Sequence, residues 1–429
     1  MKPAVSTTEH PPGNTVARVP LGEALRFWTR LGFISFGGPA GQIAIMHEEL
    51  VERRKWIDEA QFLHALNFCM LLPGPEAQQL ATWLGWRMHG VRGGIAAGAL
   101  FVLPSLLLMI ALAWLYLAHG GNALVDGALG AVKPAVVAIV MVAAWRIGRR
   151  TLTGRLLLFI AVAACAARLA GAPFPLLVGI AALLGWCRPG LFEAPVGSVA
   201  ASPSRGLWRR AALVAAAGVA LWGASLGALV ASFGWSHPYP QMGWFFTKAA
   251  LLTFGGAYAV LPYVFDGAVD GHQWLSAAQM IDGLALGETT PGPLIMIVAF
   301  VGFLGSWQAP AAGVDSLALA GALGACIATW FTFLPSFLFI LGGAPLVEAT
   351  RHRMRLSAPL AAISAAVVGA IVHLGLFLAG HVLIVAGRPD PTAIAIAGAA
   401  SLALTWARRS ILQIVVVAAA IGAGMAALH

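Results

Sequence analysis

The chain has 429 residues, of which 59% are hydrophobic and only 10% are charged, and its mean hydropathy is +0.84. Soluble domains carry about 25% charged residues, so this composition excludes a soluble globular protein and indicates an integral membrane protein. The net charge of +9 does not indicate nucleic-acid binding, because the basic residues lie between apolar segments and read as topology signals.

The first two apolar runs are each interrupted by residues that break helices. Leu31–Met46 contains Phe36-Gly37-Gly38-Pro39, and Phe62–Trp86 contains Pro73-Gly74-Pro75. Two prolines around a glycine remove backbone donors and prevent a regular helix. The second run is therefore predicted to form two half-helices that meet at an unwound turn.

The remaining runs of the first half are more regular. They are Gly93–Leu117, Ala128–Trp145, Leu156–Ala167 and Phe174–Trp186. The last two are short for a hydrocarbon core of about 30 Å, which needs roughly 20 residues. A polar, basic linker, Glu193–Arg210, comes next, and an apolar run without a partner in the first half, Ala211–Phe233, follows it.

The second half repeats the first. Phe245 begins a stretch that matches the stretch from Phe27 to Pro75 when the sequence is shifted by 218 positions, and it contains a second Phe-Gly-Gly and a second Pro-Gly-Pro. Further on the shift becomes 231, where Leu103-Pro104-Ser105 meets Leu334-Pro335-Ser336. The last runs are Pro359–Ala379, Thr392–Trp406 and Ile411–Leu428. An internal duplication follows: a first repeat in residues 1–190, a linker and central helix in 191–240, and a second repeat in 241–429.

Counting these runs gives a topology of about thirteen hydrophobic spans. The fold class expected is therefore an all-α polytopic membrane protein with broken helices. Equivalent runs of the two repeats are seven spans apart, and an odd number of spans reverses the direction across the membrane. The repeats are therefore expected to have inverted orientations, as in many secondary transporters. Most of the 26 Lys and Arg residues fall on one side. This bias predicts a cytoplasmic N-terminus and an external C-terminus.

Broken runs at matching positions of inverted halves are the best sequence indication of a transport site. Free amides and helix N-termini at such breaks favour an anion. Ionisable residues in or beside apolar runs are also candidates, because charge is costly in hydrocarbon. The candidates for substrate binding or translocation are Arg30, Phe36, Gly37, Gly38, Pro73, Gly74, Pro75, Glu76, Gln78, Lys248, Phe254, Gly255, Gly256, Tyr258, Glu288, Thr290, Pro291, Gly292 and Pro293.

Each kind of candidate also has a structural explanation. Paired glycines allow close helix packing in membranes. Arg30 and Lys248, which coincide in the repeat register, can extend to the interface instead of lining a cavity. Glu76 and Glu288 can be carboxylates at helix ends without a transport role, and Tyr258 can be an interfacial anchor.

No cofactor, metal site or enzyme chemistry is expected. The four cysteines form no closely spaced pairs, and the histidines show no metal-ligand spacing. The chain also lacks a phosphate-binding GxxxxGK[ST] motif, so a gradient is expected to drive transport.

Five motifs together resemble the long, two-domain members of the chromate ion transporter family. They are Phe36–Pro39, Leu72–Leu80, Phe101–Pro104, Phe254–Pro262 and Thr289–Leu294. The resemblance covers essentially the whole chain. It implies export of chromate from the bacterial cytoplasm and resistance to it, with sulfate as a competing analogue.

The expected function is therefore secondary active export of a tetrahedral oxyanion, coupled to protons. The expected partners are chromate, sulfate, protons, the lipid bilayer and a second copy of the chain in a homodimer, without nucleic acid. One alternative is a carrier for sulfate or another oxyanion. The other is a membrane-embedded reductase, for which the sequence offers no redox constellation.

Overall fold

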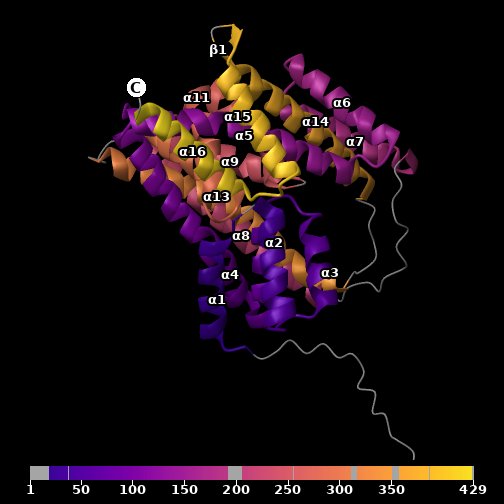
Figure 1. The fold of residues 1–429 in the computed structure, drawn as a ribbon. Helices are drawn as coiled ribbons and strands as arrows, with labels where there is room; N and C mark the ends of the chain where they lie inside the picture. Colours follow the sequence, from indigo (N-terminus) through magenta and orange to yellow (C-terminus); the bar gives the residue numbers. More distant parts are fainter. Residues whose placement is uncertain are drawn as a thin grey trace, which may run out of the picture.

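The computed structural model of the chain describes residues 19–36, 38–191, 205–254, 256–310, 316–349, 357–385 and 387–427. Within these ranges the protein is almost entirely α-helical (Figure 1). The exception is a short antiparallel pair, β1 (Ile384–Val385) and β2 (Arg388–Pro389), which the sequence analysis did not predict. The all-α membrane class is confirmed.

The helices follow the order of the apolar runs. The first half contains α1 (Leu21–Ile34), α2 (Gly38–His47), α3 (Glu59–Cys69), α4 (Glu76–Ala118), α5 (Ala123–Thr151), α6 (Arg155–Leu169) and α7 (Phe174–Cys187). After α8 (Arg205–Phe233) come α9 (Pro238–Leu252), α10 (Leu261–Phe265), α11 (Ala277–Thr289), α12 (Ile297–Gln308), α13 (Leu317–Ala349), α14 (Ser357–Val382), α15 (Pro391–Thr405) and α16 (Ile411–Ala427). Short helical turns are η1 (Glu48–Arg53), η2 (Pro189–Leu191), η3 (Ala257–Val260), η4 (Asp266–Gly271) and η5 (Leu294–Met296).

The predicted runs do not correspond one to one with full-length spanning helices. Within the described residues, five helical segments are long and apolar enough to cross a membrane alone: α4, α5, residues 211–233, residues 317–343 and residues 358–382. The 43-residue α4 joins two predicted runs through a kink at His89 and Gly90. Shorter helices such as the 15-residue α6 reach only about 22 Å, because each residue adds about 1.5 Å. They need neighbours to be covered in a bilayer.

The buried face of α1 recurs in α9. In α1 the buried residues include Ala24, Phe27, Trp28 and Leu31, which follow the i, i+3, i+4, i+7 spacing of one helix face. The residues 218 positions later in α9 are also buried: Met242, Phe245, Phe246 and Ala249. The two halves therefore bury the same helix face.

The turn that follows each broken run also recurs. Both η1 and η4 are π-helical and lie 218 positions apart. The Trp56 amide donates to Leu50 O at 2.8 Å, and the Trp274 amide donates to Ala268 O at 2.8 Å. Each tryptophan also packs edge-on against the first phenylalanine of its repeat. The repeated tryptophan therefore anchors the turn.

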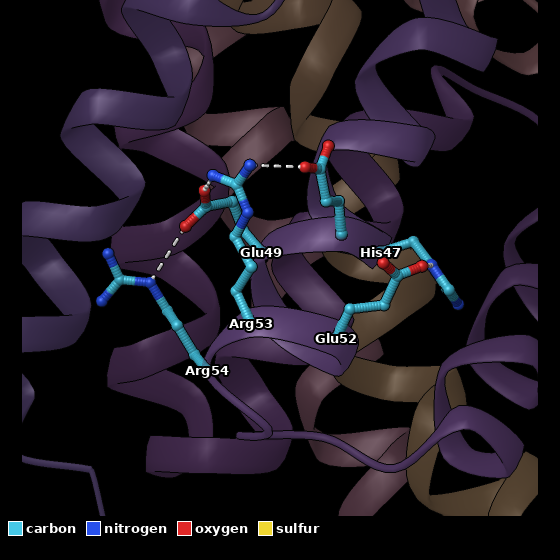
Figure 2. Close-up of polar contacts among 6 residues, drawn as sticks. His47, Glu49, Glu52, Arg53 and Arg54 are labelled. Atoms are coloured by element: carbon cyan, nitrogen blue, oxygen red, sulfur yellow. Dashed lines mark hydrogen bonds and ion pairs between the residues drawn. The ribbon is translucent and has the colours of Figure 1, made fainter.

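In the first half, this turn carries a network of surface ion pairs (Figure 2). Arg53 contacts Glu49 at 2.9 Å, and Arg54 contacts it at 3.2 Å. Burial acts to raise the pKa of Glu49, but the hydrogen bonds from Arg54 and Arg53 outweigh it, so the pKa lies below its usual value. Exposed pairs of this kind stabilise a fold by at most about 1 kcal/mol each. We assign the network a local structural role.

The C-terminal helices of each half pack on the other half. α6 and α7 pack on α14, whereas α15 and α16 pack on α5. Glycines allow the close approach in both places: a Cβ on Gly185 of α7 would lie 2.6 Å from Ala358 O, and one on Gly422 of α16 would lie 2.6 Å from the Ala131 Cβ. Neither half buries its surface alone.

The apolar core is divided in two. One cluster lies within α1, α2, η1, α3 and the first part of α4, and receives Ile340 from α13. The larger cluster joins the later helices of both halves. Figure 1 shows the first group as a lobe below the main body of the protein. The breaks described below lie where the lobe meets the body.

The contact between α16 and α5 gives a first prediction. Gly422→Ala places a methyl group against Gly127 O and Ala131, and such overpacking costs about 1–3 kcal/mol. Gly424→Ala is the matched control on the same helix, because nothing lies within 4 Å of its added Cβ. Alanine is the better helix former, so this control should keep or raise stability, by at most about 1 kcal/mol. Thermal unfolding in detergent measures both variants. Equal melting temperatures would contradict the packing.

Candidate functional site: two junctions between broken helices

The repeated motifs all lie at helix ends. α1 ends at Ile34 and α9 at Leu252, directly before the two Phe-Gly-Gly sequences. α3 ends at Cys69 and α11 at Thr289, before the two Pro-Gly-Pro sequences. New helical structure begins after each motif. The prolines explain the second pair of interruptions, because they cannot donate backbone hydrogen bonds.

Each Pro-Gly-Pro sequence is hydrogen-bonded to the opposite half of the chain. The Gly74 amide donates to Thr253 O at 2.7 Å, and the Gly292 amide donates to Ser35 O at 2.7 Å. We call the first contact junction A and the second junction B. The donors are 218 positions apart, and so are the acceptors. The two junctions are therefore equivalent contacts with the halves exchanged.

Both central glycines are required by conformation and by space. Gly74 has φ +124° and Gly292 has φ +101°, and residues other than glycine rarely adopt such backbone angles. An added Cβ on Gly74 would lie 2.7 Å from Gln79 Nε2, and one on Gly292 would lie 2.6 Å from the Ser105 Cβ. The amides of these glycines are used within the protein and do not face a substrate directly.

Hydroxyl side chains complete the junctions in matching pairs. Ser35 Oγ donates to Leu31 O at 2.6 Å, and Thr253 Oγ1 donates to Ala249 O at 2.7 Å, so each hydroxyl bonds back to the last turn of its own helix. Ser336 lies against Gly74 in junction A, as Ser105 lies against Gly292 in junction B. All four are buried. The Pro-Ser pairs noted in the repeat register thus pack on the opposite half.

Three fully buried glutamines surround the junctions. The amide NH₂ of Gln42 donates to Gly292 O, and that of Gln79 donates to Pro73 O at 2.7 Å. Gln78 donates to Thr82 Oγ1 at 3.0 Å. The side-chain oxygen of each has no hydrogen-bond partner within the part of the chain that the structure describes. Unpaired buried polar atoms are costly, so they indicate a place that can receive a polar ligand or water.

Two carboxyl groups lie beside the junctions. Glu288, which is 8% exposed, accepts a hydrogen bond from Tyr258 Oη at 2.8 Å. Glu76 begins α4, and its Oε1 lies 3.8 Å from the position of a Cβ on Gly256. The turn η3, which contains Tyr258, packs on η5 after the second Pro-Gly-Pro sequence. The two junctions are therefore close neighbours.

The other break residues surround these contacts. Phe36 and Phe254 are half-buried, Gly38 and Gly256 have positive φ, and Thr290 Oγ1 donates to Gly287 O at 3.0 Å. Pro75, Pro291 and Pro293 are buried, and Pro73 is half-buried. Gly37 and Gly255 lie outside the described residues.

The structure does not place the two predicted cations at the junctions. Arg30 is exposed on α1, on the same side as the exposed apolar residues Phe33 and Ile34. Lys248 is exposed on α9, and its Nζ lies 5.8 Å from the ring centroid of the exposed Trp244. These surroundings fit side chains that extend to an interface. The assignment of both cations to a central cavity was drawn from the repeat register, which does not define the exposed face.

Several residues of the site were not selected from the sequence. Ser35, Gln42 and Thr253 look ordinary in an apolar run, although the shared register of Ser35 and Thr253 was a usable signal. The pairing of Asp282 with Lys133 at 3.1 Å was not predicted either. Among the described residues, no group of three or more His, Cys, Asp or Glu could hold a metal ion.

The fold and the junctions define a polytopic α-helical membrane protein in which broken helices of two repeats meet. The chromate transporter family model matches two regions, residues 22–186 and 240–425. The chain belongs to this family, and the resemblance found in the sequence is confirmed.

Known relatives extend over nearly the full length of the chain. It is 30% identical to a chromate transport protein of Cupriavidus metallidurans, over 95% of this chain and 94% of the relative. It is 36% identical to a chromate transport protein of Pseudomonas aeruginosa, over 92% and 89%. A probable chromate transport protein of Synechococcus elongatus is 28% identical, over 90% and 96%. No solved structure shows a significant match to the chain.

The junction glycines give a second prediction. In Gly74→Ala and Gly292→Ala, steric overlap with the opposite half should cost about 1–3 kcal/mol in addition to backbone strain. Gly90→Ala is the control, since Gly90 also has positive φ but has nothing within 4 Å of an added Cβ. The two junction variants should therefore lose more thermal stability than the control. An equal decrease in melting temperature for all three would show that the junctions are not tightly packed.

Proposed function

We propose that the protein exports chromate across the bacterial inner membrane and that the region between junctions A and B forms the transport site. The observation that carries the proposal is the reciprocal pair of hydrogen bonds, from Gly74 to Thr253 and from Gly292 to Ser35. A broken helix held by the opposite repeat can change its environment when the repeats move against each other. A packing element alone would not need two equivalent interruptions.

The chemistry around the junctions suits a tetrahedral oxyanion. α2 and α4 begin at the breaks, and helix N-termini carry about half a positive charge. The NH₂ groups of Gln42, Gln78 and Gln79 can donate to an oxyanion once they leave their present partners, Gly292 O, Thr82 Oγ1 and Pro73 O. Chromate and sulfate share shape and charge, so the same groups would bind both.

The direction of transport has an electrical reason. An inside-negative potential favours exit of an anion by about 2.3 kcal/mol per charge per 100 mV. Export of a dianion therefore proceeds with the potential, and antiport with protons adds the proton gradient. Removal of chromate from the cytoplasm would make the cell resistant to it.

The proposal includes an inverted arrangement of residues 1–190 and 241–429 around a connecting segment, with the N-terminus cytoplasmic and the C-terminus outside. Three observations support it: the family model matches twice, local structure recurs at a shift of 218, and the terminal helices of each half pack on the other half. The proposal also includes a homodimer. Only 11% of the apolar, membrane-spanning part of α8 is buried within one chain. This helix would therefore contact lipid or a second copy of the chain.

Anion flux in proteoliposomes containing the purified protein tests this function. With a membrane potential that is positive inside the liposomes, chromate should accumulate in them above the level in protein-free liposomes. Sulfate should compete with this uptake. The control is a variant with Pro73-Gly74-Pro75 replaced by three alanines, which should insert normally but carry no chromate because its turn can become helical. Sulfate flux without chromate flux would instead favour the sulfate carrier, and undiminished flux in the alanine variant would remove the role of the break.

The exposed cations and the buried amides give opposite predictions. Gln78→Met removes a buried amide of similar size and should raise the half-saturating chromate concentration at least about tenfold, since one hydrogen bond to a charged group is worth about 1.5–3 kcal/mol. Arg30→Gln and Lys248→Gln should leave that concentration within about twofold, because exposed charges are screened by water and salt. Concentration-dependent chromate uptake into everted vesicles measures all three. A raised half-saturating concentration in the Arg30 and Lys248 variants, with no change in Gln78→Met, would instead indicate that the cations bind the substrate.

A further inference from the structure

An ion pair links α11 to α5 in the first half of the chain. Lys133 Nζ on α5 lies 3.1 Å from Asp282 Oδ1 on α11, and Tyr116 Oη on α4 donates to Asp282 Oδ2 at 3.0 Å. Asp282 is 4% exposed. A buried carboxylate with a single cationic partner depends on that partner, because losing it leaves an unpaired charge in a medium of low polarity.

The pair occurs in one half only. Under the shift of 218 the position equivalent to Asp282 holds His64, and under the shift of 231 the position equivalent to Lys133 holds Ser364. The junctions are duplicated, whereas this carboxylate and lysine are not. The pair therefore has a role that the repeated architecture does not require.

Two hollows lie beside the helices that the ion pair joins. An apolar cavity of about 320 Å³ lies between α5, α11 and α16, lined by residues such as Leu129, Ala285 and Val415. A second cavity of about 300 Å³ lies near the ion pair, and Lys133 itself lines it. With space close to it, α11 can shift against α5 when the pair opens.

The second cavity connects the pair with the protein surface. It is also lined by His381 and Val385, which are exposed, and by Asp390. These residues precede or follow the β1–β2 turn, which the charge bias of the loops places outside the cytoplasm. Protons from the outer side can therefore reach Lys133, whose Nζ lies 3.1 Å from Asp282 Oδ1.

The charged and titratable groups facing Asp282 are few. α4 contributes Tyr116, and α5 contributes Lys133 and, seven residues earlier, Asp126, which acts on Asp282 electrostatically. α12 and α16 also pack on α11 and have no charged residue. The cavity adds His381 and Asp390, and α11 itself carries Glu288.

We propose that Asp282 is the binding site of the coupling proton and that Lys133 is its exchangeable partner. An outer proton binds Asp282 Oδ1, the carboxyl group becomes neutral and keeps its hydrogen bond with Tyr116, and Lys133 turns toward the cavity. α11 is then released from α5. Because α11 ends at the second Pro-Gly-Pro sequence, its movement reaches junction B. Loss of the proton to the cytoplasm restores the pair.

This inference rests on the proposed function and explains its proton coupling. Glu76 and Glu288 are the carboxylates beside the junctions, and the structure gives Glu288 a neutral tyrosine partner. Among the carboxylates beside the broken helices that the structure describes, only Asp282 combines burial with a lysine partner, and that lysine lines the second cavity. The empty carrier would return with a net positive charge, which the inside-negative potential also favours.

The test compares two fluxes in everted vesicles that contain the full chain. Chromate counterflow, with chromate on both sides, needs no net proton movement, whereas uptake driven by an acidic lumen does. In Asp282→Asn the group cannot exchange a proton, so uptake driven by the pH gradient should fall at least about tenfold while counterflow stays within about threefold of wild type. Asp282→Glu keeps the proton and should retain a measurable part of the response. Lys133→Gln should also lose it.

A matched control is the ion pair between Arg168 and Asp266, which also joins the two halves at 2.7 Å. Asp266→Asn should leave the response to the pH gradient unchanged. A full response in Asp282→Asn would overturn the proposal, as would a wild-type chromate flux that ignores the pH gradient. If Asp282→Asn does not insert, Lys133→Gln decides, and a full response there has the same consequence. Absence of wild-type counterflow would instead contradict the proposed chromate transport itself.

Discussion

The structure depends on a reciprocal exchange of two backbone hydrogen bonds. The turn of one Pro-Gly-Pro sequence donates to the residue before Phe-Gly-Gly in the other half, at Gly74 with Thr253 and at Gly292 with Ser35. A break in a membrane helix leaves polar backbone groups that lipid cannot satisfy. Each half supplies the partners for the other half, so the breaks are stable only when both halves are together. The exchanged packing of α6 and α7 on α14, and of α15 and α16 on α5, follows the same rule on a larger scale.

Much of this arrangement could be predicted from the sequence, because glycine and proline act locally. Pro73 and Pro75 interrupt a helix wherever they occur, so the turn between α3 and α4 follows from the sequence alone. The repeat register likewise relates Gly74 to Gly292 and Trp56 to Trp274. The lengths of the helices were harder to predict. Two separate apolar runs were expected on either side of His89 and Gly90, but α4 continues through them, because a kinked helix can keep its remaining hydrogen bonds.

The partners across the halves could not be predicted, because they depend on distances between segments far apart in the chain. Arg30 and Lys248 coincide in the register, yet both lie on exposed faces, since the register shows equivalence but not direction. Gln42 contacts Gly292, 250 residues away, and nothing near Gln42 in the sequence indicates this. The pairing of Lys133 with Asp282 is of the same kind. Symmetry therefore located the breaks, and the three-dimensional structure was needed for the side chains around them.

The central claim is that chromate binds between the two junctions. Anomalous scattering at the chromium absorption edge, from crystals of the protein grown with chromate, locates the ion without relying on transport activity. The account predicts a peak between η3 and η5, within reach of the Gln78 side chain. A peak beside Arg30 or Lys248, with none near the junctions, would contradict it.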